Sequence, residues 1–191
     1  WLARRGPGRL PEPFDRFDMG VMVASAAALA SWITLPEHAV TLVLALLAGA
    51  LNAARLGRWA GDRTAAEPLV LVLHVAFAFV PAGFVLLALS IAVPGHLTAS
   101  AALHGWTAGA IGLMTLAVMT RASLGHTGQP LAATRPITFI YLAATLAAIL
   151  RMLAGVAVLR EPMLVLSAAL WVGAFGGFVI VYAPLLAAAR R

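Results

Sequence analysis

Five histidines are the side chains of this sequence best suited to hold a metal ion or a haem iron. Imidazole is a common ligand of both haem iron and copper. The 191 residues contain no cysteine, which excludes disulfides, thiolate catalysis and cysteine-ligated zinc or iron–sulfur centres within them. They also show no nucleophile triad, phosphate-binding loop or pair of catalytic carboxylates, so hydrolase and kinase chemistry has no support. The histidines are His38, His74, His96, His104 and His126.

The spacing of these histidines predicts two sites rather than one. His104 and His126 are 22 residues apart on nearly continuous apolar sequence, which corresponds to about 33 Å of helix. They cannot ligate the same ion. We expect an inner site around His74 and His126, which can approach each other across an antiparallel hairpin. An outer site is expected around His104, with His96 or His38.

The surroundings of each histidine favour some as ligands over others. His38 and His96 stand in turns next to prolines, where a solvated ring is the usual outcome. His74 and His104 stand inside apolar stretches, where a polar ring is costly unless it is bonded and therefore marks a functional site. A hydrogen bond to a neighbouring helix is the competing interpretation for both.

Arg151 is the most unusual charged residue, because it lies about eight residues inside an apolar segment. No acidic residue stands within any apolar segment except near its ends, so an internal ion pair is not expected. A cofactor carboxylate such as a haem propionate would satisfy the guanidinium with two parallel hydrogen bonds. Alternatively, the side chain reaches outward to Glu161 or to lipid phosphate.

The elements that must position these residues are membrane-spanning helices. Hydrophobic residues make up 62% of the chain, and the mean hydropathy is +0.96, far above the values of soluble domains. A bilayer core needs roughly 20 apolar residues per helix. We therefore predict an all-α integral membrane bundle of six transmembrane helices. Their apolar segments are Phe17–Leu35, Ala39–Leu56, Leu69–Val93, Ala99–Leu124, Ile137–Leu159 and Met163–Ala189.

The distribution of arginine predicts the orientation of this bundle. Eleven arginines fall on the side that holds both chain ends, whereas only Arg160 falls on the other. This bias predicts that both termini lie in the cytoplasm. It also accounts for the net charge of +6 without nucleic acid as a partner. We expect residues 1–16 to be a truncated cytoplasmic segment and residues 17–189 to form the transmembrane domain.

Glycines are frequent where helices should touch. The stretches GWTAG, Gly105–Gly109, and GAFGG, Gly173–Gly177, each contain a small-xxx-small pair. Close helix contact is the simpler interpretation. The other is that glycine lets a flat cofactor approach the backbone.

One long motif resembles a known family. The run LHGWTAGAIGLMTLAVMTRASLGHTGQPL, Leu103–Leu131, resembles the signature region of the NnrS family, bacterial membrane proteins associated with haem, copper and the response to nitric oxide. The stretches NAARLGRWAGDRTAAEPLVLVLH, Asn52–His74, and YLAATLAAILRMLAG, Tyr141–Gly155, are similar to its flanking regions. The resemblance runs in order from about Phe14 to Ala189.

This resemblance implies specific site residues. It implies that His74, His104 and His126 ligate haem or metal, and that Arg121 and Arg151 pair with haem carboxylates. The sequence departs from the family pattern at Gln129, where an arginine is expected, and at Phe77 and Phe79, which replace an expected tyrosine and tryptophan. Typical members are longer, with further histidines in a first half, so the chain is expected to be a C-terminal half or a short relative.

Three functions follow as hypotheses. The first is a protein that binds haem b, with copper as a second candidate cofactor, in nitric oxide metabolism or nitrosative-stress defence. There the histidine-ligated metal binds nitric oxide or carries electrons. Whether catalysis follows is open, and the lack of a carboxylate relay in the membrane argues against a proton-consuming reductase. The second is a metal or small-molecule transporter lined by the histidines. The third is a structural subunit that packs into a respiratory complex or a homo-oligomer.

Overall fold

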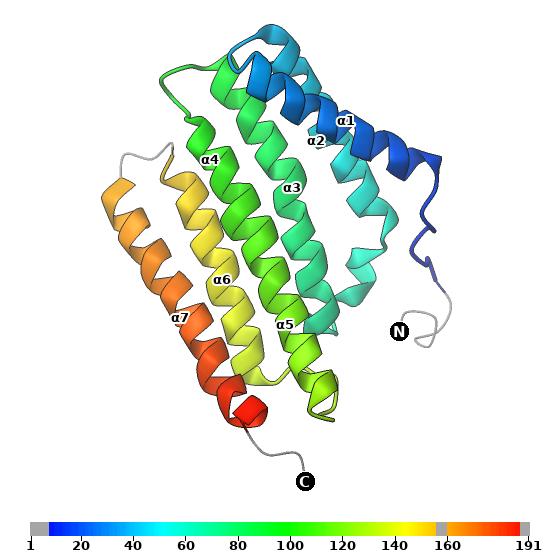
Figure 1. Ribbon diagram of the computed structural model, residues 1–191, viewed down its shortest axis with the longest axis vertical. Helices are drawn as coiled ribbons and strands as arrows, with labels where there is room; N and C mark the ends of the chain where they lie inside the picture. The colour runs from blue at the N-terminus through cyan, green and yellow to red at the C-terminus, as the bar shows by residue number, and fades with distance from the viewer. Residues whose placement is uncertain (1–7, 156–159, 188–191) are drawn as a thin grey trace.

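The computed structural model describes residues 8–155 and 160–187, and these form a bundle of antiparallel helices (Figure 1). Its elements, in chain order, are α1 Arg16–Thr34, α2 Ala39–Arg58, the short 3₁₀ helix η2 Gly61–Thr64, α3 Pro68–Ala92, α4 Ala99–His104, the π-helix η3 Gly105–Gly112, α5 Leu113–His126, α6 Arg135–Leu153 and α7 Arg160–Ala187. Residues 8–155 and 160–187 contain no β-strand.

Six of these helical stretches are long and apolar enough to cross a membrane, which confirms the predicted fold class. The fourth stretch is continuous from Ala99 to His126 and comprises α4, η3 and α5. The sequence did not indicate its central π-helical segment. Such segments within α-helices are rare and are often found at functional sites.

Most helix ends lie within about two residues of their predicted positions, and two differ by more. The fifth spanning helix, α6, ends at Leu153 and is followed by a turn at Ala154 and Gly155. The rest of its predicted range, residues 156–159, lies outside the described residues. The helix α7 begins at Arg160 rather than Met163 because Pro162 falls in the first turn, where its missing N–H costs little. The predicted end at Ala189 is also outside the described residues.

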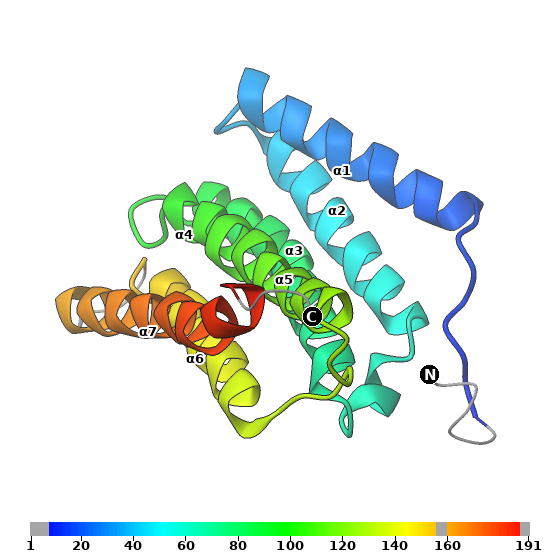
Figure 2. The same ribbon diagram turned by 60° about the horizontal axis from the view of Figure 1, so that its bottom comes forward.

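Helices that follow each other in the chain pack side by side. The helix α1 packs on α2, α2 on α3, and α6 on α7, while α3 and α6 flank the helix formed by α4, η3 and α5. Figure 2 shows α1 and α7 at opposite edges of this arrangement. The main core lies among α3, α5, α6 and α7, and includes Leu113, Leu116, Tyr141 and Tyr182. The α1 to α2 and α3 to α4 connections, the last residues of α6 and the first residues of α7 all lie at one end of the bundle (Figure 1).

Close packing depends on several glycines, as the first interpretation of the small-residue pairs predicts. A Cβ added to Gly109 would lie 2.3 Å from Cγ of Phe79 on α3. A Cβ on Gly112 would lie 2.3 Å from the indole of Trp171 on α7. By contrast, a Cβ on Gly173 would meet no atom within 4 Å. The π-helical segment therefore packs closely against α3 and against Trp171 of α7.

Polar side chains fix the start of the first two helices. Asp15 accepts hydrogen bonds from the backbone N–H groups of Phe17 and Asp18 and caps α1, with Asp18 completing a capping box. His38 caps α2 by accepting from the N–H of Val40 at 3.2 Å. The ring of His38 is exposed, as the sequence predicted, and it also caps α2.

Candidate functional site

An apolar groove of about 540 Å³ lies between the α4–η3 segment, α6 and α7. It contains two polar residues that the sequence singled out separately, His104 on α4 and Arg151 on α6. Ligand pockets in proteins typically span about 300 to 1,000 Å³, so the groove is large enough for a cofactor. Its lining residues are His104, Ala108, Arg151, Leu164, Val165, Ser167, Ala168 and Trp171.

The backbone of its own helix fixes the ring of His104. Its Nδ1 lies 2.6 Å from the carbonyl oxygen of Ser100, one turn earlier, and 3.2 Å from the Ser100 hydroxyl. A carbonyl can only accept, so this bond requires the proton on Nδ1 and leaves Nε2 with a free lone pair. In a histidine held in this way, the hydrogen bond to one nitrogen orients the ring, and the other nitrogen is free to act as a ligand.

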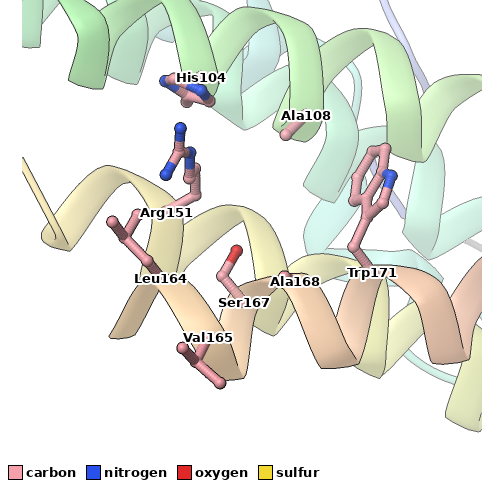
Figure 3. A pocket seen from close by; sticks show the side chains of 8 residues that line it. All are labelled: His104, Ala108, Arg151, Leu164, Val165, Ser167, Ala168 and Trp171. Carbon is pink, nitrogen blue, oxygen red and sulfur yellow. The ribbon is translucent and has the colours of Figure 1, made fainter. Parts of the chain in front are cut away.

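The guanidinium of Arg151 points across the groove toward His104 (Figure 3). The side chain is half-buried, and no carboxylate in the described part of the chain lies within 4.0 Å of it. The alternative contact with Glu161 is therefore not formed. An arginine facing an apolar groove without an acidic partner is suited to bind an anionic group of a ligand.

The walls of the groove come mainly from α7. Ser167 is buried and donates its hydroxyl to the carbonyl of Ala147 at 2.7 Å, which joins α7 to α6. Trp171 packs against Gly112, and its indole closes the end of the groove away from Arg151 (Figure 3). Leu164 and Val165 complete an apolar side wall. These α7 residues were not predicted, because only the packing of α7 against α4 and η3 brings them to the site.

A second groove, also of about 540 Å³, surrounds His74 between α2, η2 and α3. The ring is half-buried, with Nδ1 3.0 Å from the carbonyl oxygen of Val70. Trp59 meets the histidine ring edge-on, with 6.2 Å between the two ring centroids. Gly61 also lies close to the ring, since a Cβ added to it would be 2.6 Å from Cδ2 of His74. Arg9 and Asp62, joined by an ion pair, line the same groove. His74 is therefore positioned much as His104 is.

The remaining predicted residues do not line either groove. His126 is the last residue of α5 and is exposed, so helix continues where the sequence predicted a loop. His96 is exposed in the turn before α4. Arg121 is half-buried on α5. The structure thus brings His104 together with Arg151, but it does not bring His74 together with His126, or His104 together with His96 or His38, in one of these grooves.

Protein side chains alone do not form a complete metal site here. Within residues 8–155 and 160–187, no group of three or more His, Asp or Glu side chains is placed to hold an ion. Each groove offers a single histidine. This arrangement suits a group that brings its own metal donors and requires only one or two from the protein.

The fold and the grooves define a class, a multi-pass helical membrane protein with an apolar histidine–arginine site between its helices. A family model described as NnrS protein matches residues 1–190, so the chain belongs to the NnrS family. Membership suggests a role in the response to nitric oxide. No curated protein and no solved structure matches the chain.

Proposed function

We propose that this chain is a haem b protein of the bacterial inner membrane that acts in nitric oxide metabolism or in defence against nitrosative stress. The observation that carries the proposal is the joint presence of His104 and Arg151 in one apolar groove between three helices. Family membership supports the link to nitric oxide.

The groove fits a haem in three respects. His104 would offer Nε2 as a ligand to the iron, because Nδ1 is committed to the Ser100 carbonyl. Arg151 offers a cation for a haem carboxylate. The other lining side chains are almost entirely apolar, as a porphyrin face requires, and the porphyrin supplies the nitrogen donors that the protein lacks.

Each residue of the chain then has a definite task. The Ser100 carbonyl holds the tautomer and the rotamer of His104, and makes its free nitrogen a better donor. Arg151 orients the bound group by pairing with its anionic edge. Leu164, Val165 and Ala108 exclude water from the groove. When bound, the haem iron would supply a centre that binds nitric oxide or carries electrons.

The groove around His74 is a second candidate site. Its histidine has the same backbone-bonded Nδ1, and the paired Arg9 and Asp62 stand at its edge. We propose it as a site for a second haem or for copper. Copper bound here would need ligands besides His74, and His126, the other histidine that the family signature implies, does not line this groove.

The experiment is a reduced-minus-oxidised visible spectrum of the purified protein, with metal analysis of the same sample. We expect a Soret band and iron, with copper present if the His74 site holds it. A colourless protein that contains no iron after expression in a haem-replete host would refute the haem proposal. Addition of nitric oxide should shift the Soret band of the reduced protein.

A further inference from the structure

A small polar chamber adjoins the groove at the end of the bundle where α6 ends and α7 begins. It shares His104, Arg151 and Leu164 with the larger groove. Its other lining residues are Thr98, Ser100, Ala101, Ala154, Gly155 and Arg160. The chamber therefore brings a second arginine, Arg160 at the start of α7, to the site of Arg151.

The charged side chains that line this chamber are both cationic. Among the described residues, Arg151 and Arg160 line it and no carboxylate does. The ion pairs found in the described part of the chain all lie elsewhere and join the N-terminal segment and α1 to α2 and η2. The positive end of the α7 dipole also lies here, because α7 begins at Arg160. An anion in the chamber would balance this charge.

The hydrogen-bonding groups of the chamber match a small oxyanion. Arginine presents a planar fork of N–H donors that pairs with two oxygens at once. The hydroxyls of Thr98 and Ser100 are additional donors. The chamber has a volume of about 30 Å³. About 10–15 Å³ of such space accommodates one water molecule, so the chamber has room for roughly two or three water-sized groups, as in a small ion.

We propose that the chamber formed by Arg151, Arg160, Ser100 and Thr98 binds a small planar oxyanion, with the chemistry of nitrite, nitrate or a carboxylate group. Two sources share this chemistry. The anion is either a free ion or the carboxylate of a larger molecule seated in the adjoining groove. The inference shares residues with the proposed function but does not depend on haem binding.

The test is a calorimetric titration of the purified protein with sodium nitrite, sodium nitrate and sodium acetate. Sodium chloride is the control, because chloride is a spherical anion that has no oxygens to pair with an arginine. We expect saturable binding of at least one planar anion. Arg160→Gln should weaken that binding at least tenfold, and Arg160→Lys, which keeps the charge but loses the fork, should weaken it less. Arg135→Gln, at the opposite end of α6, is the matched control and should leave binding unchanged.

The source is distinguished by repeating the nitrite titration with haem and with haem dimethyl ester, which has no free carboxylate. Competition by haem but not by its ester assigns the chamber to a carboxylate of the larger molecule. Nitrite binding that neither compound affects assigns it to a free ion. The proposal is overturned if no planar anion binds saturably, or if Arg160→Gln binds as tightly as the unaltered protein. Either of these results would leave the haem proposal standing.

Discussion

At the scale of single residues, the site is defined by what each polar side chain is bonded to. His104 and His74 both use Nδ1 on a carbonyl of their own helix, one turn earlier, and so present Nε2 to a groove. Arg151 has no such internal partner among the described residues and faces the groove instead. Polar groups within a membrane bundle are costly, and these three are arranged to bind something other than each other.

Arg151→Gln should weaken haem binding. Loss of a charge-assisted hydrogen bond removes about 1.5–3 kcal/mol, which corresponds to roughly a tenfold to hundredfold increase in Kd. Haem titration followed at the Soret band measures this change. Arg135→Gln removes an exposed arginine from the same helix and should have no effect. Equal affinities of the two variants would show that Arg151 does not contact the cofactor.

Asp15 should make stability depend on acid pH. The Arg58 guanidinium, whose Nη2 lies 2.7 Å from Oδ2 of Asp15, lowers the pKa of that carboxyl to about 2. Because the pKa is lower in the folded than in the unfolded state, the stabilisation is complete above about pH 4 and is lost as the pH falls toward 2. Asp15→Asn keeps a capping oxygen but does not titrate. Its Tm should therefore change less with pH over this interval, and identical pH profiles would contradict the pairing.

At the scale of helices, the site depends on the close approach of the π-helical segment to its neighbours. Gly109 contacts Phe79 of α3, and Gly112 contacts Trp171 of α7. The contact of Gly112 with Trp171 holds the indole at the end of the groove, while the contact of Gly109 with Phe79 holds η3 against α3. A hydrogen bond also joins η3 to α3, because the indole N–H of Trp106 donates to the carbonyl of Val80 on α3 at 3.1 Å.

Gly109→Ala should destabilise the bundle. The added Cβ would lie 2.3 Å from Phe79, and overpacking of this kind costs about 1–3 kcal/mol. Gly173→Ala is the control, because its Cβ meets open space and alanine favours helix over glycine by about 1 kcal/mol. Thermal unfolding in detergent should give a lower Tm for the first variant and an unchanged or higher Tm for the second. The reverse order would contradict the close contact.

The sequence predicted the helices better than it predicted the partners of the site. Length and apolarity suffice to find six spanning helices, and a polar residue in an apolar segment suffices to single out His104, His74 and Arg151 individually. His104 and Arg151 share a groove because of the way α4 is aligned along α6. Residue spacing within a single helix does not reveal that alignment. His126 was expected to turn back toward His74. Instead α5 continues through Gly125, and the chain turns only at Gly128, with φ of +69°.

At the scale of the whole molecule, the two grooves lie at opposite ends of the bundle. The groove of His104 adjoins the end that holds the α3 to α4 connection and the start of α7, while His74 lies near the start of α3 at the other end. If both termini are cytoplasmic, as the arginine distribution predicts, the His104 groove and its anion chamber are near the outer surface. The His74 groove is then near the inner surface.

Labelling of single cysteines tests this orientation, because the chain contains none of its own. Glu37→Cys in the α1 to α2 connection should react with a membrane-impermeant maleimide in intact bacterial cells. Gln129→Cys, which follows α5 at the other end, should react only after permeabilisation. Both positions are exposed in the structure. The opposite pattern would show that the termini are outside.

The central claim is that His104 ligates haem in the groove it shares with Arg151. Its most direct test is a haem titration of the unaltered protein, of His104→Ala and of His96→Ala, which removes an exposed histidine from the turn before the same helix. Loss of groups that merely support a ligand costs about 10- to 100-fold in affinity, so loss of the ligand itself should cost at least that much. We expect His104→Ala to bind haem at least about a hundredfold more weakly, with an altered Soret band, and His96→Ala to match the unaltered protein. Unchanged affinity and an unchanged spectrum in His104→Ala would contradict the claim.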